Sequence, residues 1–339
     1  MTIAERDLAA ARNGDEDAFA RLIEPYRATL HAHCYRMLGS YQDAEDALQE
    51  TLLSAWRALP RFQERSSLKS WLYKIATNAS LKAIERRPKR VLPIDYGPPA
   101  DPHDGLSAPL VESTWIEPYP EATGDGDITS APEAHYEHRE SLELAFVAAL
   151  QHVPARQRAV LILRDVLGFS AKEVGEALDI SSVAVDSALQ RAHRTVDERL
   201  PERSQQTTLA ALGDERLRDV VGSFVDAWER ADVDAVVELL THDATFAMPP
   251  HSTWLRGDEA IAMFMRARPL APGRRWRLVN VGANGQPAFG AYRFDAQREQ
   301  FFADAIMVLA MTDARISDIA CFRSPAMFAQ FGLPATIQP

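Results

Sequence analysis

The sequence predicts a multidomain fold: two all-α domains, the second with a helix-turn-helix, followed by an α+β domain whose curved sheet forms a cone. Three observations predict this. The chain has 339 residues, more than one typical domain contains. Residues 91–140 hold one Lys or Arg against eleven Asp or Glu, with eight Pro, which is a linker composition. Beyond residue 210, segments in which apolar and polar residues alternate, as in strands, appear for the first time beside segments with the apolar spacing of helices. We therefore expect domains at 1–90, 141–203 and 210–336, and an acidic linker at 91–140.

Composition and the N-terminal residues favour a cytoplasmic protein. Cys34 and Cys321 lie far apart, which is not a disulfide framework and fits a reducing compartment. The N-terminal MTIAERDLAA is charged and lacks the apolar stretch of a signal peptide. The sequence contains no uninterrupted apolar run of about 18 residues that would span a membrane.

A group of possible metal ligands occurs in LHAHCYRML, at His31, His33 and Cys34. Helical geometry places positions 31 and 33 on different faces, and no fourth ligand is near in the sequence. Neither a metal nor a cofactor is therefore expected.

The first domain contains an expected helix over residues 43–59, DAEDALQETLLSAWRAL, with an apolar stripe at spacings of three and four. Its opposite face carries acids and amides without Lys, beside an exposed apolar residue: Asp46, Gln49, Glu50 and Leu53. This face suits a basic, partly apolar partner. The alternative is a solvated face whose acids favour the positive end of the helix dipole.

The next stretch, residues 61–90, is strongly basic, with nine Lys or Arg against two Glu. Ser66 or Ser67 can cap a helix that starts near Leu68, and Pro88 stops it. Aromatic residues are interleaved with the charges, a pattern typical of nucleic-acid sites. The alternative is a solvated basic helix whose Trp71 belongs to the core.

The second domain is expected to contain four helices between residues 141 and 200, with a tight LDIS turn between the last two. These proportions are typical of a helix-turn-helix, although an ordinary helical hairpin remains possible. Side chains of the last helix that would reach a major groove are Ser182, Val183, Ala184, Asp186, Ser187, Gln190, Arg191 and Arg194.

Three stretches together resemble bacterial extracytoplasmic-function (ECF) RNA polymerase sigma factors, over residues 8–200: DAEDALQETLLSAWRALPRF, SSLKSWLYKIATN and LGFSAKEVGEALDISSVAVDSALQRA. The resemblance implies that Asp46, Gln49 and Glu50, which match the family's DxxQE pattern, and the adjacent Leu53 bind the clamp helices of the β′ and β subunits of core polymerase. It also implies that residues 62–90 melt and read the −10 promoter element around a flipped base. The residues expected there are Phe62, Arg65, Ser66, Ser67, Lys69, Lys74, Asn78, Lys82 and Arg86.

The resemblance implies that residues 182–196 read the −35 element. The chain departs from the family pattern at Asp186 and Ala188, where basic residues are usual. Two fewer positive charges would weaken phosphate attraction, which leaves the −35 preference open.

The third domain resembles a SnoaL-like, ketosteroid-isomerase-like cone in its expected element order, α-β-α-β-β-β, with strands around an Asn-Gly turn. Candidates near its mouth are Asp226, His242, Asp243, Trp254, Arg256, Asn284, Tyr292 and Asp304. No paired-carboxylate or nucleophile motif distinguishes one of them, so no catalytic residue is expected. The resemblance to sigma factors instead implies that this domain controls activity through intramolecular contacts with the sigma domains. These contacts would either hold an inactive arrangement or support an active one.

The linker contains an apolar patch, TWIEPYP, inside an acidic tract. Trp115, Pro118 and Tyr119 gain little unless they are buried, so we expect them to dock on the cone, and the cone to contact the first helical domain. The rival hypothesis is a DNA-binding regulator fused to an isomerase, hydrolase or ligand-sensing domain. The DxxQE helix argues against it, because a plain repressor needs no polymerase-facing helix.

Overall fold

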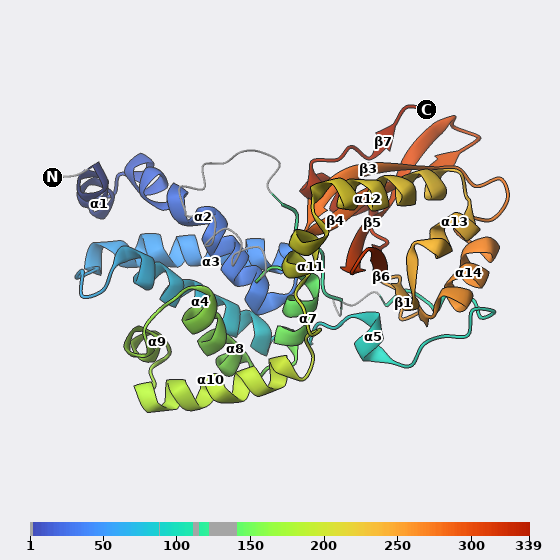
Figure 1. Ribbon diagram of the computed structural model, residues 1–339. Helices are drawn as coiled ribbons and strands as arrows, with labels where there is room; N and C mark the ends of the chain where they lie inside the picture. The colour runs from blue at the N-terminus through green and yellow to red at the C-terminus, as the bar shows by residue number, and fades with distance from the viewer. Residues whose placement is uncertain (1–2, 88, 111–114, 122–140) are drawn as a thin grey trace. The chain divides into compact units, whose positions relative to one another are not determined.

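The computed structural model describes residues 3–87, 89–110, 115–121 and 141–339. The chain divides into two compact units (Figure 1). The helical unit comprises residues 1–90 and 146–200, and the sheet unit comprises residues 91–145 and 201–339. None of the helices in the described part of the chain has both the length and the apolar composition that a membrane span requires.

The first half of the helical unit is a group of α-helices around an apolar core. Asp15, Ser40 and Ser67 each cap a helix by accepting a hydrogen bond from the backbone N–H three residues on. Leu30, Leu48 and Leu72 are fully buried between the helices. Pro88, the expected stop of the last helix, lies outside the described residues. The elements are α1 (Ile3–Arg12), α2 (Glu16–Leu38), α3 (Tyr41–Ala58), the 3-10 turn η1 (Leu59–Arg61) and α4 (Leu68–Glu85).

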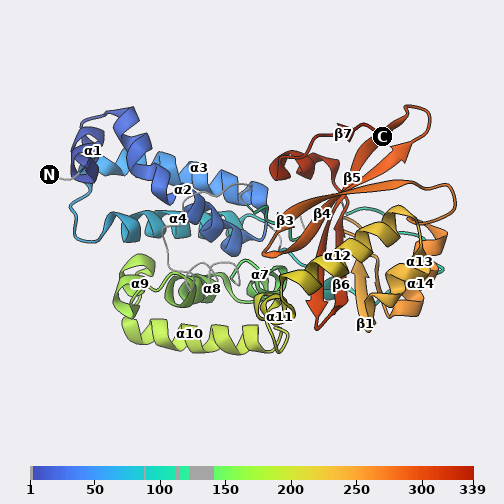
Figure 2. The same ribbon diagram turned by 45° about the horizontal axis from the view of Figure 1, so that its top comes forward.

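The second half of the helical unit contains the predicted helix-turn-helix. Ser170 and Glu173 form a capping box at the start of its first helix. A Cβ at Gly175 would lie 2.7 Å from the carbonyl oxygen of Ile180, so the tight turn requires glycine there. Within the unit, α8 and α9 pack against α4 (Figure 2). The elements are α7 (Leu144–Gln151), α8 (Ala155–Leu161), the π-helical turn η2 (Ile162–Val166), α9 (Ala171–Leu178) and α10 (Ser182–Asp197).

The sheet unit is built on one sheet with the strand order β2-β1-β6-β5-β4-β3, in which β1 and β6 are parallel and the other neighbours antiparallel. Register shifts interrupt the β4–β5 and β5–β6 pairs, and such bulges bend a sheet. β7 adds to β5. The strands are β1 (Leu240–Ala247), β2 (Trp254–Arg256), β3 (Trp276–Ala283), β4 (Gln286–Asp295), β5 (Gln300–Thr312), β6 (Arg315–Phe322) and β7 (Thr336–Ile337).

Helices cover the concave sheet and close an aromatic core. The rings of Phe224 and Phe289 stack at 5.9 Å, and those of Trp228 and Trp276 meet edge-on at 6.3 Å. α12 packs on β3, and α14 packs on β1 and β2. The predicted α+β cone is therefore confirmed. Its helices are α11 (Gln205–Leu212), α12 (Asp214–Glu229), α13 (Val233–Glu238), α14 (Asp258–Ala267) and the 3-10 segment η3 (Pro325–Phe331).

The described part of the expected linker belongs to the sheet unit and follows both edges of the sheet. Ala100 N–H donates to the Trp254 carbonyl on edge strand β2, and Glu121 N–H donates to the Gly282 carbonyl on edge strand β3. It contains one short helix, α5 (Pro93–Tyr96). An open sheet edge presents unpaired backbone groups, and the linker satisfies some of them here. Residues 122–140 of the linker lie outside the described residues.

Candidate functional site

Helix α3 carries an exposed face that is both acidic and apolar. Leu53 on this face is 51% exposed, which is unusual for a large apolar side chain in a helix that also packs against a core. Gln49 donates to Glu45 at 3.4 Å and Ser54 donates to Glu50 at 3.3 Å, so neighbours on the helix orient the polar groups. The four expected polymerase-contacting side chains are all exposed on α3: Asp46, Gln49, Glu50 and Leu53.

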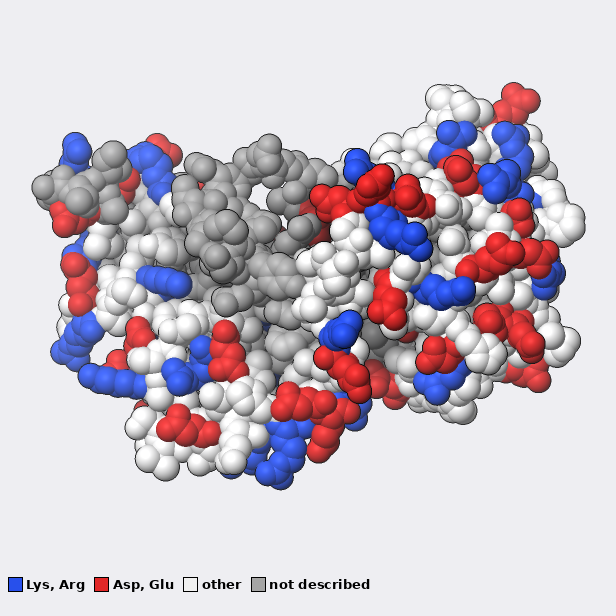
Figure 3. Space-filling model, viewed as in Figure 1, with Lys and Arg blue, Asp and Glu red and all other residues white. Residues whose placement is uncertain are grey.

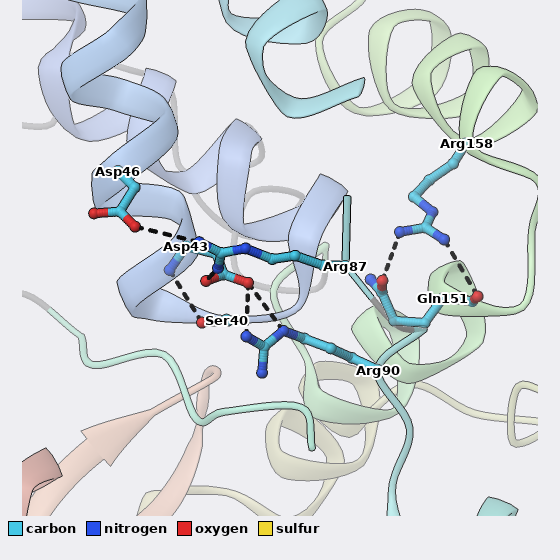
Figure 4. A network of polar contacts seen from close by, with 7 residues as sticks. All are labelled: Ser40, Asp43, Asp46, Arg87, Arg90, Gln151 and Arg158. Atoms are coloured by element: carbon cyan, nitrogen blue, oxygen red, sulfur yellow. Dashed lines mark hydrogen bonds and ion pairs between the residues drawn. The ribbon is translucent and has the colours of Figure 1, made fainter. Parts of the chain in front are cut away.

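Asp43, one turn before Asp46, is buried and holds the end of α4 against α3 (Figure 4). Arg90 donates to Asp43 Oδ2 from Nη2 at 2.6 Å and from Nε at 3.2 Å, and Arg87 also contacts this carboxylate. Arg87 reaches Asp46 at 3.5 Å as well. Arg90 is only 5% exposed, so its charge serves packing, and the DNA-facing charge is smaller than the sequence count implies.

The basic stretch exposes five side chains along α4 that are expected to contact the −10 element: Lys69, Lys74, Asn78, Lys82 and Arg86. In the loop before α4, Arg65 and Ser67 are exposed and Ser66 is half-buried. The ring centres of Phe62 and Trp71 lie 4.7 Å apart, and Trp71 packs against the small core around Leu59. Figure 3 shows Lys and Arg side chains gathered where α3 runs into η1 and α4. This end of the helical unit has the charge that a phosphate backbone attracts.

One side of α4 is occupied by the helix-turn-helix segment within the same unit. Lys74 Nζ donates to the Glu176 carbonyl at 2.7 Å, and Ser70 donates to Glu173 at 3.3 Å. Lys69 lies 5.5 Å from the centre of the Phe169 ring. Two expected DNA contacts, Lys69 and Lys74, therefore touch residues 169–176 in this arrangement.

Arg158 is a residue that sequence reasoning missed, and it joins the two halves of the helical unit. It is 5% exposed, and its guanidinium donates to the carbonyls of Met37, Gln151 and Val153 and to the Gln151 side chain (Figure 4). Burial lowers the pKa of Arg158 to about 10. Met37 lies in the last turn of α2, where carbonyls lack partners within the helix and favour a cation. The signal in the sequence is an Arg inside the apolar run ARQRAVLIL.

Helix α10 presents the expected −35 residues. Seven of the eight are exposed, Val183 at 73%, and Ala184 is half-buried. Ala188 is only 7% exposed, because it packs with Val185 and Ala192 on the inner face. The expected loss of two DNA-facing charges is therefore wrong for position 188, where a charge would be buried, and it applies to Asp186 alone.

The three linker residues lie in the sheet unit. Trp115 Nε1 donates to the Pro250 carbonyl at 3.0 Å, and Trp115 and Pro118 are buried. Tyr119 N–H donates to Asn284 Oδ1 at 2.8 Å, while Asn284 Nδ2 donates to the Leu142 carbonyl at 2.7 Å. The side chain of Asn284 thus holds residues 119 and 142, on either side of the undescribed 122–140.

A buried polar cluster continues from Asn284 along the β3–β4 turn. Gln286 Oε1 accepts from Leu144 N–H, and Glu143 accepts from the N–H groups of Gln205 and Gln206 at the start of α11. The chain leaves the sheet unit after residue 145 and returns at 201, so this cluster holds both segments that flank residues 146–200.

The cone encloses a cavity of about 380 Å³, and among the expected mouth candidates only Asp304 lines it. The others have different roles: Asn284 and Trp254 bind the linker, and Tyr292 donates to the Pro334 carbonyl. His242 is exposed and pairs with Asp258, which raises the pKa of His242. The placement of the other seven candidates at a mouth was therefore wrong, because none of them lines the cavity.

Three family models match the chain in order. Sigma-70 region 2 matches residues 22–90, Sigma-70 region 4 matches residues 143–196, and the SnoaL-like domain matches residues 221–319. The ECF RNA polymerase sigma factor SigG of Mycobacterium tuberculosis H37Rv is 41% identical over 334 residues, which cover 98% of this chain and 87% of that protein. SigW of Bacillus subtilis is 26% identical over 200 residues, 59% of this chain and 97% of SigW.

Among solved structures, the Mycobacterium tuberculosis ECF sigma factor SigJ covers 92% of this chain and 99% of its own, with a TM-score of 0.60 at 21% identity. This likeness concerns the fold. The SigG likeness extends from the first helices through the cone at an identity that shows the family. The chain belongs to the ECF RNA polymerase sigma factors, with sigma regions 2 and 4 and a C-terminal SnoaL-like domain.

Proposed function

We propose that this sigma factor binds core RNA polymerase, in the cytoplasm, through the face of α3 formed by Asp46, Gln49, Glu50 and Leu53. The partners would be basic helices of the β′ and β subunits. The observation that carries this is the separation of roles on α3: Asp43 is buried and paired, whereas these four side chains are all exposed. Charge complementarity with an apolar centre provides both orientation and affinity.

The test is Asp46→Lys with Glu50→Lys. Like charges against basic helices cost several kcal/mol, so co-purification with core polymerase should fall by at least about 100-fold. The matched control, Glu215→Lys with Asp219→Lys, makes the same change at the same spacing on exposed α12. Normal co-purification of the α3 variant would overturn the interface, as would an equal loss in the control.

We infer that α4 and its preceding loop read the −10 element, and that α10 reads the −35 element. These elements are about 25 base pairs apart, roughly 85 Å at about 3.4 Å per base pair. Lys74 lies 2.7 Å from the backbone of α9, so a unit in this arrangement does not span that distance. Promoter binding therefore requires residues 146–200 to separate from α4.

We propose that the SnoaL-like domain controls this separation by holding the linker. Ala100, Leu110 and Glu121 of the described linker bind backbone groups of the sheet unit, and residues 141–145 are held at Asn284 and Gln286. A bound linker shortens the tether between regions 2 and 4 compared with a free one. The domain thus acts as a restraint on opening, and intramolecular contacts replace part of the role of a separate inhibitor.

We infer that the SnoaL-like domain is not a catalyst. Asp304 is the only carboxylate among the described residues that line its cavity, and both of its oxygens face guanidinium groups of Arg293 and Arg323. A general base needs a lone pair directed at substrate, and this arrangement favours binding over proton abstraction.

A further inference from the structure

The cavity of the cone has the size and lining of a small-molecule site. Its volume of about 380 Å³ lies in the range typical of ligand pockets. Two indole rings, Trp228 and Trp276, and two phenyl rings, Phe246 and Phe264, form its apolar wall, with Met307 beside them. Flat rings and a flexible thioether accommodate a ligand with an apolar, ring-containing body.

One end of the cavity carries an excess of positive charge. Arg293 Nε lies 3.5 Å from Asp304 Oδ1, and Arg323 Nε lies 3.4 Å from Oδ2. Well-formed pairs of this kind measure about 2.7–2.9 Å, so the two cations share one carboxylate loosely. A guanidinium has five N–H donors, and this geometry leaves capacity for a second carboxylate. Arg268 and Arg274 add two further positive charges to the lining.

We propose that this cavity binds a small amphipathic monocarboxylic acid. Its ring-containing body would lie against Trp228 and Trp276, and its carboxylate would bind Arg293 and Arg323. A single carboxylate would offset the one-cation excess of the Arg293–Asp304–Arg323 group, and Arg268 and Arg274 keep the lining as a whole positive. Neutral analogues would leave that group uncompensated, and cationic analogues would be repelled.

The linker completes the wall of this site. Leu106 lines the cavity and packs against the sheet-unit core. Arg268, which also lines it, donates to the Asp104 carbonyl at 3.5 Å. Ser107 is held by Ser252 and Thr253, so Leu106 sits beside an anchored residue. A ligand in the cavity would therefore contact the linker at Leu106 and stabilise the linker in its bound position on the sheet unit. This consequence rests on the proposed function, in which the bound linker restrains opening.

Binding is tested on the full chain by calorimetry with 1-naphthylacetate, against 2-(1-naphthyl)ethanol as the neutral analogue of the same body. We expect saturable one-to-one binding of the acid, at least about 10-fold tighter than the alcohol. Arg323→Gln should remove most of that preference while leaving alcohol binding unchanged. Ala305→Leu, which fills the cavity, should abolish both. Arg266→Gln on the outer side of α14 is the matched control and should change neither.

Equal affinity for acid and alcohol, or an unaffected preference in Arg323→Gln, would overturn the carboxylate assignment. No saturable binding up to millimolar acid, or binding that survives Ala305→Leu, would overturn the cavity as a site. Linker coupling is read separately, by limited proteolysis of residues 91–121. 1-Naphthylacetate should slow cleavage several-fold in the parent and not in Leu106→Ala. Unslowed cleavage with intact binding would reject the coupling alone, and no transcription assay enters this test.

Discussion

At the scale of single residues, two buried groups in the helical unit are charged or chargeable without an opposite charge among their described partners. Arg158 relies on neutral carbonyls, and His33 bonds only to the Thr77 hydroxyl through Nε2, at 2.9 Å. Such groups make the unit sensitive to substitution and to pH, because a buried polar group left without its partner costs free energy.

Arg158→Met should lower the free energy of unfolding of the helical unit by about 2–5 kcal/mol, because the carbonyls of Met37, Gln151 and Val153 lose their donor. Urea unfolding followed by helix content measures the change. Arg156→Met, two residues earlier and exposed, is the control and should alter stability by less than about 0.5 kcal/mol. Similar losses in both variants would mean that the carbonyl network contributes little.

His33 should make the helical unit acid-sensitive. Burial lowers the pKa of His33 to about 3, from about 6.5 in the unfolded chain. The unfolded state then binds the proton first, so the stability is complete above pH 6.5 and is lost as pH falls toward 3, by several kcal/mol at most. Hydrogen exchange of α2 and α4 amides at pH 7 and pH 4.5 measures this. His33→Gln, an uncharged replacement, should flatten the dependence, and an unchanged slope would exclude His33 as its source.

At the scale of elements, the contact between α4 and α9 is the one that the proposed separation of residues 146–200 from α4 would break. It combines two polar contacts, Lys74 on the Glu176 carbonyl and Ser70 on Glu173, with an edge-on contact between the rings of Tyr73 and Phe169 just before α9. Exposed polar contacts of this kind contribute little individually, so the buried Tyr73–Phe169 contact and the bond of Arg158 to Met37 set most of the cost of separation. The helix-turn-helix itself is better fixed, by the capping box and by the close approach at Gly175.

Locking α9 on α4 should stop promoter-dependent transcription. The variant is Ser70→Cys with Glu173→Cys, joined by a disulfide-containing bifunctional thiol cross-linker, because Cys is shorter than the Glu173 side chain that now reaches Ser70. The native Cys34 and Cys321 are buried. Cross-linked protein should lose at least about 10-fold in transcription with core polymerase, and a reductant that cleaves the cross-linker should restore it. Each single variant is the control. Full activity of the cross-linked protein would show that separation is not required.

At the scale of the whole molecule, Asn284 connects the two linker segments through which we propose that the sheet unit controls opening. Its backbone is left-handed, with φ 57°, and its side chain holds Tyr119 and Leu142 together. Asn284→Gly keeps this backbone conformation and removes both side-chain hydrogen bonds. Asp313→Gly, at the β5–β6 turn with φ 52° and an exposed side chain, is a matched control.

If the sheet unit restrains opening through the linker, Asn284→Gly should raise promoter-dependent transcription by about threefold or more and expose residues 115–121 to protease. Sheet content by circular dichroism should stay as in the parent. Asp313→Gly should change neither readout. If Asn284→Gly releases the linker and lowers transcription, the domain instead supports the active arrangement. If transcription does not change, the domain does not control activity through the linker.

The sequence by itself determined the helical blocks, the helix-turn-helix, the cone and the exposed face of α3. Each of these follows from local patterns: apolar spacing, caps, a required glycine and charges within one or two turns. The Asn-Gly turn is a further case, since Asn284 and Gly285 both have positive φ.

Only the tertiary structure decided which polar residues are buried and by what. Arg158 meets Met37, Tyr119 meets Asn284 and Glu143 meets Gln205, all across more than 60 positions of sequence. The burial of Ala188 and of Arg90 likewise depends on neighbouring helices. Composition marked the linker as unable to fold alone, which is compatible with its place along the sheet edges. The linker packs against backbone groups of strands that are distant in the sequence, and no local pattern within the linker specifies those partners.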